Sequence, residues 1–354
     1  MGSSLFLLAM LTVPVAAGAV GSIPPSYLCL PAGDTGLTSK IIAFGGQEIT
    51  GYVNATGCDV GIYVPPGANN VVIQRATISG ANEHAILAMN VVGLLITGNT
   101  VTGNGLVITS HVSDNKAIEL VGTSDSIVSR NALSNNSQNG GIALVDDGPI
   151  DPGAPNPGNL SASSGNVVEY NHIIATSPSE SGIVLAAYNA GAGVNDNLVL
   201  GNVILGNSPR NPGPGNGQIV LAADGLGASL SNNTVAANII DGSLLPGIVV
   251  QSNAPGDVVS NTVIADNNIV NNGGYTVGGS YTSTNDPINS TGIAVIAEAA
   301  PHEASPPTVE NTIVLNNIVT GNTFGIWTCE TSHTLVTGLI GNSTKSSMSC
   351  PLGP

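Results

Sequence analysis

Residues 181–207 of this 354-residue chain read SGIVLAAYNAGAGVNDNLVLGNVILGN. Three short aliphatic runs, at residues 182–185, 198–200 and 203–205, are separated by Gly and Asn. Short aliphatic and β-branched runs bounded by turn residues are typical of strands, because helices need longer periodic segments. The stretch therefore predicts several short strands joined by tight corners.

A Gly-Ile strand like the one in this stretch recurs along the chain, with its first residue replaced in some copies. A minimum spacing near 24 residues with longer variants predicts a solenoid, in which each copy belongs to one coil and the extra residues form loops. The spacings between the nine copies are 24, 32, 24, 41, 36, 29, 45 and 33 residues. Their isoleucines are Ile62, Ile86, Ile118, Ile142, Ile183, Ile219, Ile248, Ile293 and Ile326.

A second pattern places Asn between two aliphatic strands. Asn tolerates the left-handed backbone that a sharp corner needs, and stacked amides can hydrogen-bond along the stack. We therefore expect ladders of Asn along the coil. The pattern occurs at Asn99, Asn131, Asn171, Asn202, Asn238, Asn267 and Asn316, with Asn again five residues after some of these, at Asn104, Asn136, Asn207 and Asn272.

The G-I-x-V and N-x-I-x-x-N motifs resemble those of right-handed parallel β-helix proteins of the pectate-lyase-like superfamily, which share the pectin lyase-like fold, over roughly residues 61–342. The resemblance implies an all-β fold, a right-handed parallel β-helix solenoid of about nine coils. We expect a signal peptide at 1–19, an N-terminal cap at 20–60, the β-helix at 61–342 and a C-terminal tail at 343–354. Because this superfamily includes lyases, hydrolases, epimerases and adhesins, the resemblance selects no activity.

The composition is acidic and poor in charge. Charged residues make up 8% of the chain, with six Lys and Arg against 22 Asp and Glu, for a formal net charge of −16. Nucleic acid is therefore not an expected partner, since phosphate binding depends on clustered Lys and Arg. The same shortage of cations argues against a polyuronate substrate unless a metal holds its carboxylates.

The first residues indicate export. Residues 5–20 are almost wholly apolar and end in Ala17-Gly18-Ala19, which is typical of a cleaved secretory signal. We expect a secreted or cell-surface protein with no membrane span after cleavage; because no Lys or Arg precedes the run, an uncleaved anchor is the alternative. Glycosylation of the exported chain would use six N-x-S/T sequons, at Asn54, Asn135, Asn159, Asn232, Asn289 and Asn342.

The four cysteines lie near the two ends of the predicted coil. Four cysteines allow three pairings, and local pairing is the most economical because the ends of a rod lie far apart. We therefore expect disulfides Cys29–Cys58 and Cys329–Cys350. They would fasten both ends of the coil, and each would raise the free energy of unfolding by about 3 kcal/mol. No C-x-x-C spacing points to a metal site.

Insertions flank the Gly-Ile strands, so loops should form walls around that sheet, where a ligand groove would lie. With the isoleucines inward, the next residue faces outward, and this column is mostly small and aliphatic. We expect loops to cover it; the alternative is an exposed apolar surface that meets a partner. The column is Tyr63, Leu87, Glu119, Ala143, Val184, Val220, Val249, Ala294 and Trp327.

One polar cluster accompanies this face. Glu119 faces outward in the third copy, and Asp146, Asp147 and Asp151 follow the fourth. Converging carboxylates could hold Ca²⁺, or act as general acid and base across a glycosidic bond. The alternative is that Asp146-Asp147-Gly148-Pro149 is a solvated turn.

Other candidates are weaker. Lys116 and Arg130 flank the cluster and could supply the base for a β-elimination, although the sequence does not give their directions. His84 lies beside the second Gly-Ile strand, and His302 and Glu303 lie in a Pro-rich insertion. The chain has no H-x-H or H-E-x-x-H spacing, and it also lacks Gly-His-Gly, Arg-Ile-Lys and Asp-Pro-His-Asp, short motifs expected of enzymes in the superfamily.

The leading hypothesis is a secreted scaffold or carbohydrate-binding module that presents loops to an extracellular glycan or surface partner. The alternative is a polysaccharide lyase or glycoside hydrolase that uses Glu119, Asp146, Asp147 and Asp151, with Ca²⁺ as the candidate cofactor. Whether the chain is an enzyme stays open at this point. A third hypothesis is self-association through the apolar Gly-Ile face.

Overall fold

The computed structural model describes residues 29–106, 116–136, 140–146, 162–174, 181–206, 217–243, 246–272, 291–297, 305–322, 324–329, 331–341 and 345–349. The predicted signal peptide lies outside this part of the chain. Strands form nearly all regular structure here; the exception is a short 3-10 turn, η1 (Gly33–Thr35). None of the described helices is long and apolar enough to cross a membrane.

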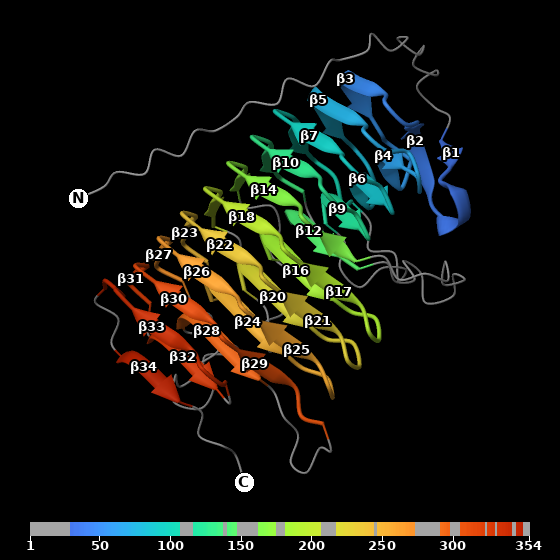
Figure 1. Ribbon diagram of the computed structural model, residues 1–354. Helices are drawn as coiled ribbons and strands as arrows, with labels where there is room; N and C mark the ends of the chain where they lie inside the picture. The colour runs from blue at the N-terminus through green and yellow to red at the C-terminus, as the bar shows by residue number, and fades with distance from the viewer. Residues whose placement is uncertain are drawn as a thin grey trace, which may run out of the picture.

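The Gly-Ile strands form one twelve-stranded sheet, the Gly-Ile sheet, whose strands are parallel from β2 onward. Its strands from β4 to β32 follow one another along the ribbon (Figure 1). All nine predicted isoleucines pair in an unbroken register from Ile62 to Ile326, which confirms the predicted repeat. The strands are β1 (Leu30–Pro31), β2 (Thr38–Ile42), β4 (Val60–Val64), β6 (His84–Met89), β9 (Ile118–Val121), β12 (Ile142–Val145), β16 (Ile183–Ala187), β20 (Ile219–Ala223), β24 (Ile248–Ser252), β28 (Thr291–Ala297), β32 (Phe324–Cys329) and β34 (Lys345–Ser349).

A seventeen-stranded sheet consists of β3 (Glu48–Asn54), β5 (Val72–Ser79) and two rows of three-residue strands separated by Asn corners. The first row is β7 (Leu95–Thr97), β10 (Ile127–Ser129), β14 (Val167–Glu169), β18 (Leu198–Leu200), β22 (Thr234–Ala236), β26 (Val263–Ala265), β30 (Ile313–Leu315) and β33 (Leu335–Thr337). The second row is β8 (Thr100–Thr102), β11 (Ala132–Ser134), β15 (His172–Ile174), β19 (Val203–Leu205), β23 (Ile239–Asp241), β27 (Asn268–Val270) and β31 (Ile318–Thr320).

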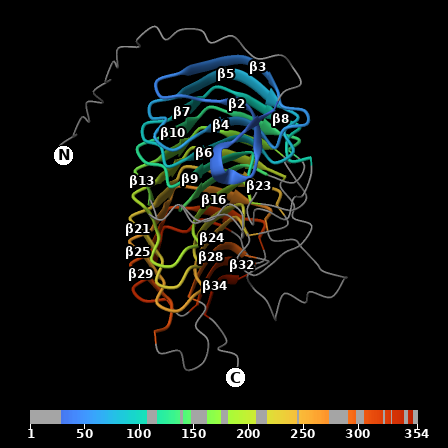
Figure 2. The ribbon, with the colours of Figure 1, turned by 90° about the vertical axis from the view of Figure 1, so that its right-hand side faces the viewer.

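A third, five-stranded sheet closes the coil: β13 (Ser163–Ser164), β17 (Gly193–Asn195), β21 (Ser229–Ser231), β25 (Val258–Ser260) and β29 (Thr308–Glu310). The coils follow one another along one axis, and each sheet forms one side of the coil (Figure 2). Inward Ile, Val and Leu from all three sheets form one continuous core, and each fully buried side chain contributes about 1.5–3 kcal/mol.

Parallel pairing begins before residue 61 and continues beyond residue 342. Strand β2 pairs with β4, β3 pairs with β5, and β34 pairs with β32. Strands therefore occupy parts of the segments expected to be the cap and the tail. The coil number and the domain boundaries stay predictions.

Buried Asn ladders join the coils. In the main ladder each Asn Nδ2 donates to the Oδ1 of the next Asn at 2.9–3.0 Å. Its last member is Asn317, so the prediction of Asn316 is wrong by one residue. The members are Asn99, Asn131, Asn171, Asn202, Asn238, Asn267 and Asn317.

Two further ladders flank the main one. The predicted second ladder links Asn104 to Asn136 through Nδ2 and Oδ1, and Asn322 Oδ1 accepts from the Asn272 backbone N–H; Asn207 lies outside the described residues. A third ladder, which the sequence analysis missed, consists of Asn166, Asn197 and Asn233. Together the ladders satisfy backbone groups at the corners of the coil, which would otherwise be buried without partners.

The residue before each rung, and not the Asn itself, takes the left-handed backbone conformation. Arg130, Tyr170 and Ala237, with φ of 53°, 53° and 55°, precede rungs of the main ladder. Of the two reasons predicted for Asn at these corners, the left-handed backbone is therefore wrong, and the hydrogen bonding of stacked amides is confirmed. The left-handed residue turns the chain, and the following Asn is then buried with its amide in the stack.

The Cys29–Cys58 disulfide is present, which confirms the predicted staple near the N-terminal end. Cys329 is also disulfide-bonded. Cys350 lies outside the described residues, so the Cys329–Cys350 pair stays a prediction.

Candidate functional site

The outward column of the Gly-Ile sheet is buried. Its nine members are at most 5% exposed. Because burial is that of the single chain, this chain itself covers them; Ala32 and Leu37, for example, belong to the same apolar cluster as Tyr63 and Leu87. The hypothesis of an exposed apolar surface here, and of self-association through it, is therefore wrong. The burial favours the predicted cover by the chain's own segments.

One cluster of titratable residues lies at this covered face: His84 on β6, Glu119 on β9, and Lys116 two residues before β9. His84 and Lys116 each stand two residues before a Gly-Ile isoleucine, so they occupy equivalent positions on neighbouring coils. Glu119 follows Ile118 and faces outward, as predicted. His84 Nδ1 lies 2.9 Å from the Lys116 carbonyl oxygen and 3.3 Å from Glu119 Oε2. The structure thus brings these three residues together.

The cluster is closed to solvent. His84 is 0%, Lys116 1% and Glu119 4% exposed. Burial lowers the pKa of His84 to about 4, with a smaller contribution in the same direction from the Lys116 charge, while the hydrogen bond to the Lys116 carbonyl opposes the shift. His84 is therefore neutral at pH 7 and donates its Nδ1 proton to that carbonyl. Its Nε2 lone pair has no hydrogen-bond partner among the described residues.

Asp146 has a different set of partners. Its Oδ1 accepts from the Tyr188 backbone N–H at 2.6 Å, and its Oδ2 accepts from the Asn189 backbone N–H at 3.2 Å and from Asn189 Nδ2 at 2.6 Å. Burial raises the pKa of Asp146, and the bonds from Asn189 act against that rise. The carboxylate thus fixes the turn that follows β16 on the next coil.

The structure does not place the other predicted site residues beside His84, Lys116 and Glu119. Asp147 and Asp151 lie outside the described residues, as do His302 and Glu303. Arg130 stands at a corner of the seventeen-stranded sheet, 5.7 Å from the centre of the Tyr170 ring, and not on the Gly-Ile sheet. Within the described part of the chain, no three His, Cys, Asp or Glu residues are grouped to hold a metal ion.

The sequence analysis placed His84 beside the second Gly-Ile strand and named no partner for it. The signal that identifies its partner is positional: His84 precedes Ile86 by two residues, just as Lys116 precedes Ile118. Since the isoleucines are in register, equivalent positions on adjacent strands are neighbours.

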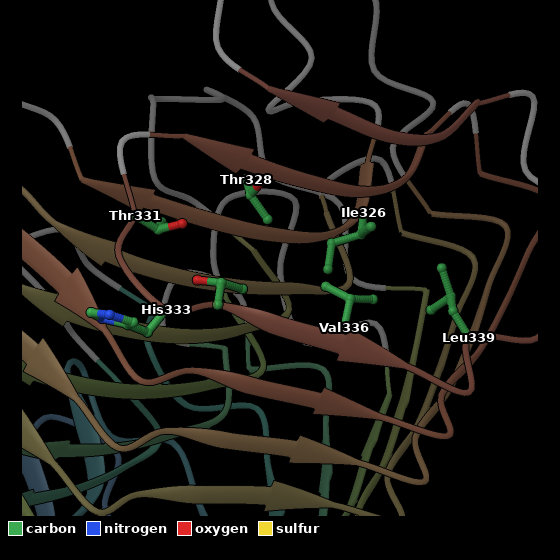
Figure 3. Close-up of a pocket in the computed structure, with 7 residues that line it drawn as sticks. Ile326, Thr328, Thr331, His333, Val336 and Leu339 are labelled. Atoms are coloured by element: carbon green, nitrogen blue, oxygen red, sulfur yellow. The ribbon is translucent and has the colours of Figure 1, made fainter.

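A cavity of about 580 Å³ lies at the C-terminal end of the coil (Figure 3). Val336 occupies the inward position of β33 but is 37% exposed, whereas Val314, its partner on β30, is fully buried. The described lining combines aliphatic side chains, three threonine hydroxyl groups and the imidazole of His333, and no carboxylate is among these residues. The lining residues are Ile326, Thr328, Thr331, His333, Thr334, Val336 and Leu339.

A family model described as the right-handed β-helix region matches residues 42–225. The chain belongs to this β-helix family. No curated protein matches the sequence. Among solved structures, the A-module of the mannuronan C-5 epimerase AlgE4 from Azotobacter vinelandii is 14% identical, with a TM-score of 0.51 over 88% of this chain and 80% of that chain.

Two other solved β-helix structures are less similar. The endo-xylogalacturonan hydrolase of Aspergillus tubingensis is 9% identical, with a TM-score of 0.47 over 89% of this chain and 76% of that one. The surface adhesin PfbA of Streptococcus pneumoniae is 12% identical, with a TM-score of 0.42 over 88% and 84%. At these identities the likeness concerns the fold alone.

Proposed function

We propose that this β-helix protein is a secreted binding module that presents its loops to an extracellular glycan or a cell-surface component. The observation that carries the proposal is the burial of the outward column of the Gly-Ile sheet together with His84, Lys116 and Glu119. A general acid or base must come within hydrogen-bond reach of its substrate, and these side chains are closed to solvent.

The charge of the chain narrows the ligand class. A formal net charge of −16 repels polyanions such as uronate polymers, so a neutral glycan is the better match. The Cys29–Cys58 disulfide supports an oxidising compartment, as secretion requires.

The test is a binding and product screen of the secreted protein on neutral and acidic polysaccharides. Each polysaccharide is assayed with Ca²⁺ and with EDTA, by co-sedimentation for binding and by reducing ends and unsaturated uronates for products. We expect binding to a neutral polysaccharide, no product, and no effect of EDTA. Binding to none of the polymers, or formation of either product, would contradict the proposal.

A polysaccharide lyase or glycoside hydrolase is the second candidate, because the His84 imidazole lies 3.3 Å from the Glu119 carboxylate and the charge of Lys116 acts on His84. Asp146, Asp147 and Asp151 complete the acidic set proposed for it, and Ca²⁺ stays a proposed cofactor. If product forms, Glu119→Gln and Asp147→Asn should each abolish it at unchanged melting temperature. Product that survives both substitutions would exclude these residues as its catalysts.

A further inference from the structure

An arginine and a tyrosine stand at neighbouring corners of the seventeen-stranded sheet, on the outer surface of the coil. Ser129 pairs with Glu169 in register, so the residues that follow them, Arg130 and Tyr170, are neighbours on adjacent coils. The guanidinium carbon of Arg130 lies over the Tyr170 ring, 5.7 Å from its centre. Arg130 is exposed and Tyr170 is 50% exposed, so both side chains reach solvent. We call these two residues the Arg–Tyr pair.

The backbone of the Arg–Tyr pair has a conformation that bulky side chains disfavour. The angle φ is 53° at both residues, in the left-handed region. In the coils on either side, the residue at the same corner, just before the Asn of the main ladder, is Gly98 or Gly201. A glycine therefore suffices to build this corner. Strained backbone of this kind is concentrated at functional sites, so the pair is a candidate for binding a ligand.

The glycine of the following coil holds the tyrosine ring in place. A Cβ atom on Gly201 would lie 2.6 Å from Cε1 and 2.7 Å from Cδ1 of Tyr170, so the ring rests where only a glycine leaves room for it. Arg130 contacts the ring from the preceding coil and Gly201 from the next one. The ring is thus positioned in advance, which reduces the entropy lost when a ligand binds to it.

The guanidinium of Arg130 has no carboxylate partner. Lys40 and Lys116 are buried, and Arg75 forms an ion pair with Glu48. Among the Lys and Arg side chains that the structure describes, Arg130 is therefore the exposed one that makes no ion pair. Its N–H donors are available to a ligand.

Two further polar residues flank the ring. Glu169 is the last residue of β14, directly before Tyr170, and His172 is the exposed first residue of β15. The surface around the ring thus offers donors on Arg130, acceptors on Glu169, and an imidazole that can do either. An aromatic ring bordered by both donors and acceptors matches a sugar, whose C–H groups pack on the ring while its hydroxyl groups both donate and accept.

We propose that the Arg–Tyr pair binds one sugar unit of a neutral glycan, with the sugar packed on the exposed part of the Tyr170 ring. This inference rests on the glycan binding proposed above and adds to it a site on the rigid coil. The Glu169 carboxylate offsets the charge of Arg130, and the formal net charge of −16 repels acidic polymers, so the site suits a neutral sugar better than a uronate.

The test is isothermal titration calorimetry of the secreted protein with dextran, laminarin, arabinoxylan, galactomannan and polygalacturonate. We expect at least one of the four neutral glycans to bind and polygalacturonate not to bind. Tyr170→Gly should raise the dissociation constant about tenfold or more, and Arg130→Gly about fivefold, whereas Tyr170→Phe, which keeps the ring, should stay within about twofold. Because both glycine variants restore the residue of the flanking coils, their melting temperatures should not fall.

The matched control is Tyr52→Ala. Tyr52 is a tyrosine of the same sheet, on β3, and is 62% exposed, and its hydroxyl pairs with that of Ser79. Its replacement should leave the dissociation constant within about twofold. Binding that Tyr170→Gly leaves unchanged, or that Tyr52→Ala weakens equally, overturns the site at the Arg–Tyr pair while the proposed binding function stands.

Three other results also decide the question. Binding to none of the glycans contradicts the proposed function and the site together. Binding to polygalacturonate that Arg130→Gly abolishes overturns the assignment of a neutral sugar. A lower melting temperature of both glycine variants, in parallel with their loss of binding, would show that the Arg–Tyr pair serves the fold and would overturn the proposal.

Discussion

Replacing Asn202 with Ala removes one rung from the middle of the main Asn ladder. The carboxamide of Asn202 takes part in four hydrogen bonds. Its Oδ1 accepts from Asn171 Nδ2 at 3.0 Å and from the Asn171 backbone N–H at 2.9 Å. Its Nδ2 donates to Asn238 Oδ1 at 3.0 Å and to the Val168 carbonyl at 2.9 Å. Asn202 is fully buried, so water does not replace the lost partners.

The loss in free energy of unfolding depends on which groups keep a hydrogen-bond partner. Asn171 Nδ2 still donates to the Val128 carbonyl at 2.9 Å, and Asn238 Oδ1 still accepts from the Asn202 backbone N–H at 2.9 Å. The Asn171 backbone N–H, in contrast, is left buried and unbonded. With about 1 kcal/mol for each lost bond and a larger cost for the orphaned donor, we expect the free energy of unfolding to fall by about 4 kcal/mol.

The assay is urea unfolding followed by far-UV circular dichroism, with Asn268→Ala as the control. Asn268 lies on β27 and is partly exposed, so its replacement should change the free energy of unfolding by less than about 0.5 kcal/mol. A loss below about 1 kcal/mol for Asn202→Ala, or equal losses for the two variants, would refute the view that the ladder stabilises the coil.

Four further changes test other parts of the structure. Ile183→Asp places an unpaired charge in the inward column and should abolish secretion of folded protein, seen as loss of soluble yield. Replacing Cys29 and Cys58 with Ser should lower the free energy of unfolding by about 3 kcal/mol, measured in urea, because their loop spans 29 residues. Ala237→Gly should raise it by about 1 kcal/mol, because φ at this residue is 55°. The pKa of His84 is lowered to about 4, so between pH 6.5 and about 4 only the unfolded chain binds a proton at this residue. The free energy of unfolding should therefore fall by about 3 kcal/mol over that pH range. The melting temperature of His84→Gln should lack this part of the pH dependence.

The repeat register could be read from the sequence because it rests on local patterns. Gly-Ile strands and Asn rungs recur at fixed offsets within each coil, and stacking then makes equivalent positions neighbours. The one-residue error at Asn316 arose because Asn316 and Asn317 both fit the pattern. Backbone conformation separates them: Asn316 has a φ of 54°, and Asn317 carries the buried amide.

The candidate site was less predictable, because it depends on contacts between coils that loops of unequal length separate. The outward direction of Glu119 followed from strand alternation, but its contact with His84 spans 35 residues. Asp146 finds its partners 42 and 43 residues further on, at the turn after β16. A prediction made from each segment alone groups Asp146 with its neighbours in sequence and misses its partners on the next coil.

The rungs of the main ladder have the same geometry although 29 to 50 residues separate consecutive members. Each rung therefore accepts any other rung as its neighbour. Removal of residues 203–238 would bring Asn202 onto Asn267 with the bonds it now makes to Asn238, and a tandem duplication would insert a coil just as readily. The length of such a rod can therefore change in evolution by whole coils, because a ladder with one rung more or fewer keeps the same hydrogen bonds.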